Sequence, residues 1–281
     1  MNNYPKVVGF VPAFNAEKFI IKTLESLGNQ TYPNFEIIIC DDASPDNTFE
    51  ICKEFAKVHP NFTVIRNETN LGWFANNEKL WRIAVDRSDY CFFSPHDDHL
   101  YPDFISEQVE ILIENPKAAL CIPGMNNCFQ NGVSFTTTYF DPIKKSDPVD
   151  RVESILERKE WWWAACHGLC KSSIIKQILP VKKLMFGEKE FFADLLWLLE
   201  IAFVGEFVHS RNILFSKNYD PKSVSGSWKY GLFNKTALWV SIWDCIHKSS
   251  LTPREKQRIR RKIFSFFANT IGNKLKIYRN K

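Results

Sequence analysis

Two adjacent carboxylates, Asp97 and Asp98, follow an apolar run and stand between two histidines, His96 and His99. Neighbouring side chains in an extended loop point in different directions, so the two acids can hold different groups. One can bind a hard cation through oxygen, while the other can accept a hydrogen bond from a sugar or ribose hydroxyl. The same pair is also compatible with a solvated turn in which Asp98 lies near a helix start.

The two flanking histidines allow a similar choice. A pair three residues apart is compatible with zinc, or with two surface side chains beside a turn, which is the interpretation we favour. The oxygen ligands that the carboxylates offer point to manganese or magnesium as the divalent ion.

The elements that must position these residues alternate in type. Short strands that are apolar throughout are separated by segments with helical periodicity, which predicts a parallel sheet covered on both faces. The predicted strands are residues 7–11, 35–40, 62–66, 90–94 and 118–122, and the predicted helices are residues 16–30, 46–58, 73–86 and 102–115.

The loops that leave the carboxyl ends of parallel strands share one edge of the sheet, where ligands of open α/β sheets bind. The first four such loops are residues 12–17, 41–47, 67–72 and 95–99, and they are rich in acids. None is a glycine-rich phosphate or dinucleotide loop. Because an anionic ligand at an acidic edge needs a cation between them, the pattern predicts a nucleotide diphosphate held through a divalent metal.

Three segments of the chain resemble the motifs of one family. Residues 7–17 read VVGFVPAFNAE, residues 30–48 read QTYPNFEIIICDDASPDNT, and residues 96–99 read HDDH. Their order and spacing resemble family 2 glycosyltransferases, in which the third segment is an Asp-x-Asp-type metal motif. The resemblance implies the GT-A fold of nucleotide-diphosphosugar transferases, with a mostly parallel twisted sheet flanked by helices.

The resemblance also implies roles for single residues. Asp42 would accept from the imide N–H of the base, Asp97 would contact the ribose or donor sugar, and Asp98 would bind Mn²⁺ or Mg²⁺. The other residues expected to bind the nucleotide sugar are Pro12, Phe14, Glu17, Asn70 and Gly72. Phe14 is equally compatible with a core position, and Asp42 with a turn-forming role.

A second informative stretch is the apolar segment 191–199, whose one acid is Asp194. The family begins this helix with a Glu-Asp pair and places a glycine eleven positions after the Asp. Asp194 and Gly205 have that spacing, although Ala193 replaces the glutamate. The resemblance therefore implies that Asp194 is the general base, with Glu190 as the second candidate. The alternative is a carboxylate that simply favours the positive end of its helix.

The acceptor side of the site is expected from residues 126–227. Residues 126–139 have the polarity of a hairpin, with Asn131-Gly132 as the turn. One of the three tryptophans at 161–163, or else His167, is expected at the acceptor.

Two closing strands are predicted at residues 207–210 and 213–216. The segment that follows lacks the histidine often present there in the family. Lys217 or Lys222 is expected to lie over the donor diphosphate when this loop closes.

Composition bounds the class of protein. The 281 residues are 45% hydrophobic and carry a net charge of +4, which suits a large globular domain with a C-terminal appendage. No apolar stretch reaches the length of a membrane span. The eight cysteines show no Cys-x-x-Cys pair, which favours reduced, buried thiols over disulfides or zinc.

We divide the chain into a glycosyltransferase domain, residues 1–227, and a basic, aromatic helical extension, residues 228–281. Residues 1–125 form its nucleotide-sugar half. Residues 251–281 contain ten Lys or Arg and a single acid, Glu255. This segment suits either contact with an anionic membrane surface or packing against the domain with a solvated basic face. Nucleic acid is not expected as a partner, because the rest of the chain has no basic groove.

Together these features predict an inverting, metal-dependent glycosyltransferase. It would move a hexose-type sugar from a nucleotide diphosphosugar, a UDP-sugar by family resemblance, to a hydroxyl of a growing surface glycan (lipopolysaccharide or capsule) or lipid-linked saccharide. We expect it in the cytoplasm, at the inner face of the cell membrane. The alternatives are a sugar-nucleotide pyrophosphorylase, although residues 12–18 lack its Gly-rich basic loop, and a nucleotide-sugar or glycan-binding protein without turnover.

Overall fold

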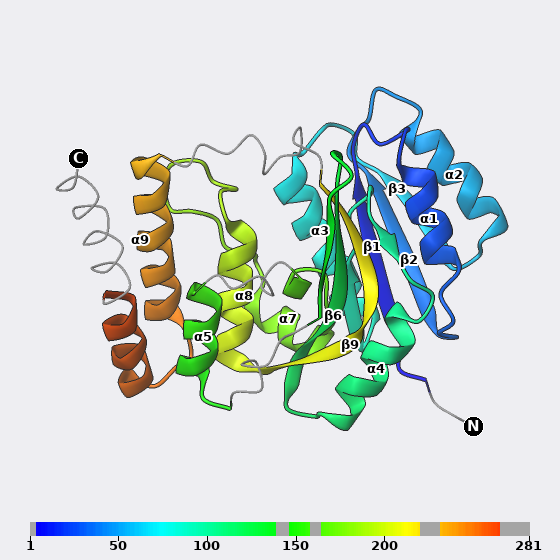
Figure 1. The fold of residues 1–281 in the computed structure, drawn as a ribbon. Coiled ribbons are helices and arrows are strands. Elements are labelled where there is room, and N and C mark those ends of the chain that lie inside the picture. Colours follow the sequence, from blue (N-terminus) through cyan, green and yellow to red (C-terminus); the bar gives the residue numbers. More distant parts are fainter. Residues whose placement is uncertain (1–3, 139–145, 158–163, 220–230, 265–281) are drawn as a thin grey trace.

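The computed structural model describes residues 4–138, 146–157, 164–219 and 231–264. One curled sheet runs through the domain, with helices on both faces (Figure 1). Within the described residues its strand order is β3-β2-β1-β4-β8-β6-β9-β5, and β7 pairs with β6 outside this path.

The first four strands are parallel neighbours, as predicted. They are β1 (Val7–Ala13), β2 (Phe35–Asp41), β3 (Phe62–Arg66) and β4 (Tyr90–Phe93). β1 and β2 are almost wholly buried, because helices cover both faces of this part of the sheet. The intervening crossovers therefore bring all four carboxyl ends to one edge.

Beyond β4 the sheet is mixed. The antiparallel strand β8 (Leu169–Lys171) joins β4 to β6 (Ala118–Phe129), and β6 runs parallel to β9 (Glu206–Tyr219). The short β5 (His99–Leu100) closes the edge against β9. The hairpin of β6 with β7 (Ser134–Thr137) is confirmed, and Gly132 takes φ 81° in its turn.

One expectation for this region was wrong, and one strand was missed. The predicted pair of strands at 207–210 and 213–216 is the single strand β9, whose pairing with β6 shifts register around Ile122 and Gly124. The exposed polar residues Arg211 and Asn212, between the two predicted strands, lie at this irregularity. β8 was not predicted, because three residues are too few to show a period.

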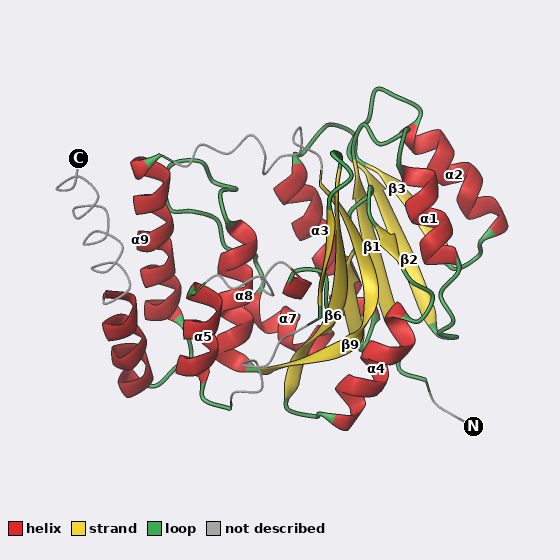
Figure 2. Ribbon diagram, viewed as in Figure 1, coloured by secondary structure: helices red, strands yellow, loops and turns green. Residues whose placement is uncertain are grey.

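The helices form a layer on each face of the sheet (Figure 2). One layer contains α1 (Ile20–Gly28), α2 (Thr48–Val58) and α4 (Phe104–Glu114), and the other contains α3 (Trp73–Arg87), α7 (Ser172–Ile178) and α8 (Ala193–Val204). α8 is apolar on nearly all sides and buried among its neighbours. Its Trp197 packs on Trp81 of α3, with ring centroids 5.3 Å apart.

Two further helices pack on α8 on the side away from the sheet (Figure 1). α5 (Pro148–Leu156) and α9 (Leu232–Lys248) both contact α8. The helix at residues 253–264 lies against α5, where Arg258 pairs with Asp147 at 2.7 Å and Lys262 pairs with Glu153. Its Ile259 and Ile263 are buried. This part of the basic extension therefore packs on the rest of the protein, as one of the two alternatives predicted.

All eight cysteines lie in the described part of the chain and are free thiols, six of them buried. The burial of these six agrees with the prediction that the cysteines are packing residues. In the same described part, no helix is both long and apolar enough to span a bilayer.

Glu200, on α8, is a buried acid with little compensation. Its side chain is 12% exposed, the ammonium of Lys182 lies 3.8 Å away, and Oε2 has no hydrogen-bond partner among the described residues. Burial raises the pKa of Glu200 to about 7, against the influence of Lys182. Because the folded state holds this proton more tightly than the unfolded state, stability should fall as pH rises from 4.5 through about 7.

We therefore expect Glu200→Gln to gain in stability relative to the wild type as pH rises. The difference in unfolding free energy should grow by about 1–3 kcal/mol across that interval and then level off. Thermal unfolding of both proteins at a series of pH values measures it. Glu114→Gln, at an exposed position of α4, is the matched control. An equal pH dependence for the wild type and Glu200→Gln would contradict this assignment.

Candidate active site

The carboxyl ends of the four parallel strands are joined directly to one another. The Asp42 N–H donates to the Ala13 carbonyl at 2.8 Å, and the Asn67 N–H donates to the Asp41 carbonyl at 2.9 Å. The Ser94 N–H donates to the Phe10 carbonyl at 2.9 Å. The loops that follow β1, β2, β3 and β4 thus begin side by side, as the sequence predicted.

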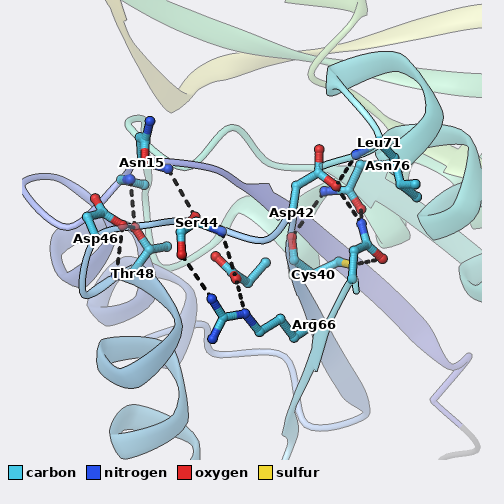
Figure 3. Close-up of polar contacts among 12 residues, drawn as sticks. Asn15, Cys40, Asp42, Ser44, Asp46, Thr48, Arg66, Leu71 and Asn76 are labelled. Carbon is cyan, nitrogen blue, oxygen red and sulfur yellow. Dashed lines mark hydrogen bonds and ion pairs between the residues drawn. The ribbon is translucent and has the colours of Figure 1, made fainter. Parts of the chain in front are cut away.

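Asp42 is the centre of one half of this edge (Figure 3). It is only 2% exposed. Its Oδ1 accepts from Asn67 Nδ2 at 2.6 Å and from the Leu71 N–H at 2.9 Å, and its Oδ2 accepts from the Gly72 N–H at 2.9 Å. The structure therefore brings Asp42 together with the predicted loop of Asn70 and Gly72, whose backbone it holds in place.

Asn67 extends this network into the sheet and α3. Its Nδ2 also donates to Asn76 Oδ1 at 3.2 Å, and its Oδ1 accepts from Lys79 Nζ at 2.7 Å. Asn76 in turn donates to the Cys40 carbonyl at 3.1 Å. Sequence reasoning named Asn67 only as a polar loop residue and did not assign it this central position.

Asp41, which the sequence left without a role, anchors the other half of the edge. It is fully buried; its Oδ2 lies 3.1 Å from Arg66 Nε and accepts from the Ser44 N–H at 3.2 Å. Arg66 also donates to the Ser44 carbonyl at 2.9 Å, and the Asn15 N–H donates to Ser44 Oγ at 3.1 Å (Figure 3). These contacts join the loops after β1 and β2.

The three residues predicted in the loop after β1 have different surroundings. Pro12 is buried, and its carbonyl lies 3.2 Å from His96 Nδ1. Phe14 is 39% exposed, so the alternative of a core position was wrong. Glu17 Oε2 accepts from the Asn47 N–H at 3.1 Å and from its side chain at 3.2 Å, which commits this carboxylate to the neighbouring loop.

Left-handed backbone conformations accumulate around the same edge. Among the described residues, the non-glycine positions with positive φ are Asn15 at 50°, Ala43 at 58° and Phe192 at 52°. The first two lie in the loops after β1 and β2, and Phe192 precedes α8. Such conformations cost about 1 kcal/mol or more for residues such as Ala and Phe, and they cluster at functional sites.

The loop with Asp97 and Asp98 is fixed from two sides. Thr23 of α1 donates to the Asp98 carbonyl at 2.8 Å. From β9, the Asn218 N–H donates to Asp98 Oδ1 at 2.7 Å, and Lys217 Nζ lies 3.0 Å from Asp98 Oδ2. Asn218 Nδ2 also donates to the Asp97 carbonyl at 2.6 Å. Both oxygens of Asp98 are therefore occupied by residues of this chain.

The ion pair of Asp98 with Lys217 is buried. Burial raises the pKa of Asp98 to about 6, although Lys217 acts in the opposite direction. Burial also opposes the charge on Lys217, but Asp98 and Asp97 outweigh it and hold the pKa of Lys217 above its ordinary value. The contact with Asp98 therefore favours the charged form of Lys217.

The surroundings of Asp98 do not fit the predicted divalent ion in this arrangement. An ion at Oδ2 would have to displace the ammonium of Lys217. Over the described ranges, no group of three or more His, Cys, Asp or Glu side chains could hold a metal. His99 is exposed and packs edge-on against Tyr101, whereas His96 lies at the Pro12 carbonyl. The prediction that Asp98 is a metal ligand stays untested.

The segment expected to face the acceptor contains both candidate bases. Asp194 lies in the first turn of α8, where its Oδ1 accepts from the Leu195 N–H at 2.9 Å. Burial raises the pKa of the Cys166 thiol, with Asp194 as the next cause, while Lys217 opposes it. Asp194 and Lys217 thus lie within electrostatic reach of one thiol. The carboxylate of Glu190 lies close to Gly72. A Cβ added to Gly72 would be 3.9 Å from Glu190 Oε1.

His167 is an aromatic core residue of this side. It is 5% exposed and stacks on Phe215, with centroids 4.4 Å apart. Burial, and secondarily Lys217, holds its pKa well below the ordinary value. The tryptophans at 161–163 and Lys222, also named from the sequence, lie outside the described residues.

Comparison with known proteins agrees with this architecture. The family model described as "Glycosyl transferase family 2" matches residues 10–160. A curated relative from Methanococcus voltae, the "Dolichyl N-acetyl-alpha-D-glucosaminyl phosphate 3-beta-D-2,3-diacetamido-2,3-dideoxy-beta-D-glucuronosyltransferase", is 37% identical over 179 residues, which cover 59% of this chain and 53% of that protein. The chain spans about half or less of the length of the first curated relatives it matches.

Solved structures share the fold at low identity. S. aureus TarS in complex with UDP-GlcNAc has a TM-score of 0.70 at 17% identity, over 93% of this chain and 73% of that one. Mannosyltransferase PcManGT from Pyrobaculum calidifontis, in complex with GDP-Man and Mn²⁺, has a TM-score of 0.58 at 16% identity, over 93% and 69%. The motifs, the sheet and the family match lead to one conclusion: the chain belongs to glycosyl transferase family 2 and has the GT-A fold.

Proposed function

We propose that this protein transfers a sugar, of the hexose type, from a nucleoside diphosphosugar to a hydroxyl of a growing surface glycan or lipid-linked saccharide, with inversion at the anomeric carbon. The observation that carries the proposal is the edge where buried carboxylates lock the loops after β1, β2, β3 and β4 into one constellation. Family membership supports the reaction class.

The nucleotide half of the proposal rests on Asp42. A carboxylate offers about four lone-pair sites, and the loop of Asn67 to Gly72 uses three of those on Asp42. One site on Oδ2 is left for an imide N–H of the base. Phe14 and Leu71, both exposed at this edge, offer apolar surface beside it. Uracil and guanine each carry such an N–H; the UDP-GlcNAc complex of TarS favours a uridine donor.

The chemical half of the proposal assigns the proton transfer to Asp194. The acceptor oxygen forms a bond to the anomeric carbon from the face opposite the leaving group, and the bond from that carbon to the diphosphate oxygen breaks. The acceptor's proton passes to the Asp194 carboxylate as the new bond forms. A positioned base of this kind contributes about 10²–10⁴ in rate. Asp194 is half-buried in the first turn of α8, where the helix dipole stabilises its ionised form.

Two other activities are less well supported. A pyrophosphorylase needs a glycine-rich basic loop after the first strand, and the loop after β1 is instead tied through Asn15 and Glu17 to the loop after β2. A binding protein without turnover would not need a carboxylate such as Asp194. Hydrolysis of a panel of nucleotide sugars, with and without Mn²⁺, distinguishes a transferase from a binding protein.

Asp194→Asn should abolish donor hydrolysis and transfer in that panel while leaving the Kd for the nucleotide within about twofold, because the amide cannot accept the proton. Glu190→Gln is the matched comparison, since Glu190 is the other acid of this segment. Near-normal turnover of Asp194→Asn with loss of turnover in Glu190→Gln would assign the base to Glu190 instead.

Asp42→Ala should weaken nucleotide binding and release the loop that Asp42 holds. The loss removes one acceptor from each of three donors, although the Gly72 N–H keeps Asn70 Oδ1 at 2.9 Å. The unfolding free energy should fall by about 1–3 kcal/mol, and hydrogen exchange at the Leu71 amide should become faster. Asp86→Ala is the control, since Asp86 forms a surface pair with Lys176. Unchanged exchange and unchanged nucleotide affinity in Asp42→Ala would refute the role of Asp42.

We further propose that residues 251–281 contact an anionic membrane surface, which would bring the site to a lipid-linked acceptor. Arg254, Arg261 and Phe264 are exposed on the helix at 253–264. Co-sedimentation with anionic vesicles, and not with neutral ones, is expected, and it should weaken on raising the salt concentration. Arg254→Gln with Arg261→Gln should reduce it, whereas Lys53→Gln on α2 should not. Equal binding to neutral vesicles would argue against this contact.

A further inference from the structure

Lys217 occupies an unusual place for a cation in this site. Its Nζ lies 3.0 Å from Asp98 Oδ2, while the Asn218 N–H takes Oδ1 at 2.7 Å. The Asp98 side chain is fully buried and that of Lys217 is 20% exposed. A positive charge supplied by the chain is therefore in direct contact with the carboxylate expected to hold a metal.

The position of Lys217 is fixed by the sheet. It lies on β9, where it pairs in register with Asn127 of β6. The next residue but one, Tyr219, places its ring 5.7 Å from the ammonium and donates from its hydroxyl to Asn127 Oδ1 at 2.9 Å. Asn218 holds the Asp97 carbonyl at 2.6 Å. The ammonium is thus presented by a strand and its neighbours, and its location does not depend on a mobile loop.

We propose that Lys217 takes the place of the divalent cation, so that donor binding and sugar transfer by this protein do not require a metal. The proposal rests on the function proposed above. Asp98 acts as the counter-ion that positions the ammonium. An ammonium has three donors; one points to Asp98, which leaves two for oxygens of the donor diphosphate.

A divalent ion and Lys217 cannot share Asp98 without mutual repulsion. Asp98 Oδ1 is bound by a backbone N–H, which cannot swing aside, so an ion could take only Oδ2. The ammonium would then remain a few ångströms from a double positive charge, an arrangement that costs several kcal/mol at an effective dielectric constant of about 20. Among the described residues, no cluster of three or more metal-ligating side chains lies elsewhere to hold such an ion.

The role in the reaction follows from charge. As the bond from the anomeric carbon to the diphosphate oxygen breaks, negative charge grows on that oxygen. The positive charge of Lys217 offsets it through hydrogen bonds whose donor is already in place, so little reorganisation accompanies the step. Lys217 is in this view a catalytic residue that contacts the leaving group.

The first experiment uses the wild-type protein. Titration calorimetry with UDP, GDP, CDP and dTDP is performed in EDTA and in Mn²⁺, and the Mn²⁺ bound in the nucleotide complex is counted by electron paramagnetic resonance. The nucleotide that binds should do so with a Kd that differs by less than about twofold between the two conditions. No stoichiometric Mn²⁺ should enter the complex.

The second experiment changes the cation. Lys217→Met should weaken binding of the same nucleotide in EDTA by about 10- to 100-fold, the range for a lost charge-assisted hydrogen bond. Lys217→Arg should keep most of the affinity, because the charge is retained. Lys176→Met, the same change at an exposed surface pair, is the control. Thermal unfolding checks that each variant is folded.

The outcomes separate this proposal from the one it rests on. Nucleotide binding that is lost in EDTA and restored by Mn²⁺ overturns the role of Lys217 and leaves the glycosyltransferase assignment intact. Full affinity of a folded Lys217→Met in EDTA overturns it as well. Failure of every nucleotide to bind under both conditions overturns the proposed function itself. The wild-type measurements decide the question even where Lys217→Met does not fold.

Discussion

The site depends on the need to compensate carboxylates that the sheet edge buries. Asp41, Asp42 and Asp98 are each at most 2% exposed, and an ionised carboxylate without partners would be strongly unfavourable in that position. Each finds its partners in segments far along the chain. Arg66 forms an ion pair with Asp41, and the backbone N–H groups of Leu71 and Gly72 donate to Asp42. Lys217 and the Asn218 N–H bind the two oxygens of Asp98. Charge compensation therefore determines how the loops are arranged.

This arrangement also gives the edge its rigidity. The carboxylates are acceptors only, so every partner is a donor whose position they fix. The loop after β3 is held by Asp42, and the loop after β4 is held between Thr23 of α1 and Asn218 of β9. The left-handed residues Asn15 and Ala43 persist because these contacts outweigh their backbone strain. A donor would meet loops that need little rearrangement, which favours tight positioning.

Sequence reasoning recovered what depends on local pattern. The strand at 62–66 was predicted with its observed bounds. The parallel pairing of the first four strands followed from apolar runs separated by helices, but their order in the sheet was not predicted. It failed for strands that are too short to show a period, such as the three-residue β8. It also failed where pairing with a distant strand keeps a strand continuous, as in β9. The αL conformations of Ala43 and Phe192 were also missed, because neither residue type signals a positive φ.

For the candidate site, too, the sequence predicted the residues that lie in short motifs and missed the partners that lie far along the chain. Asp42, Asp97 and Asp98 were identified from short motifs, and the edge that unites their loops followed from parallel topology. Their partners were not, since Lys217 is 119 residues from Asp98 and no local pattern links the two. Lys217 or Lys222 was expected over a diphosphate after loop closure, and β9 already carries Lys217 at the carboxylate of Asp98. Sheet pairing of β9 with β5 and β6 creates this contact.

A cation attached to the chain differs physically from one bound from solution. An exchangeable ion takes its position from several ligands, which at Mg²⁺ sites are one or two carboxylates together with substrate phosphates and water. A lysine takes its position from the covalent chain and needs only a single counter-ion. The oxygens of the buried Asp98 contact one ammonium, that of Lys217, and one backbone N–H, that of Asn218. This arrangement is the one expected where a lysine supplies the positive charge. In the proposed reaction, Asp98 would then matter for where it holds the positive charge of Lys217, and this ammonium would be the cation that meets an anionic donor.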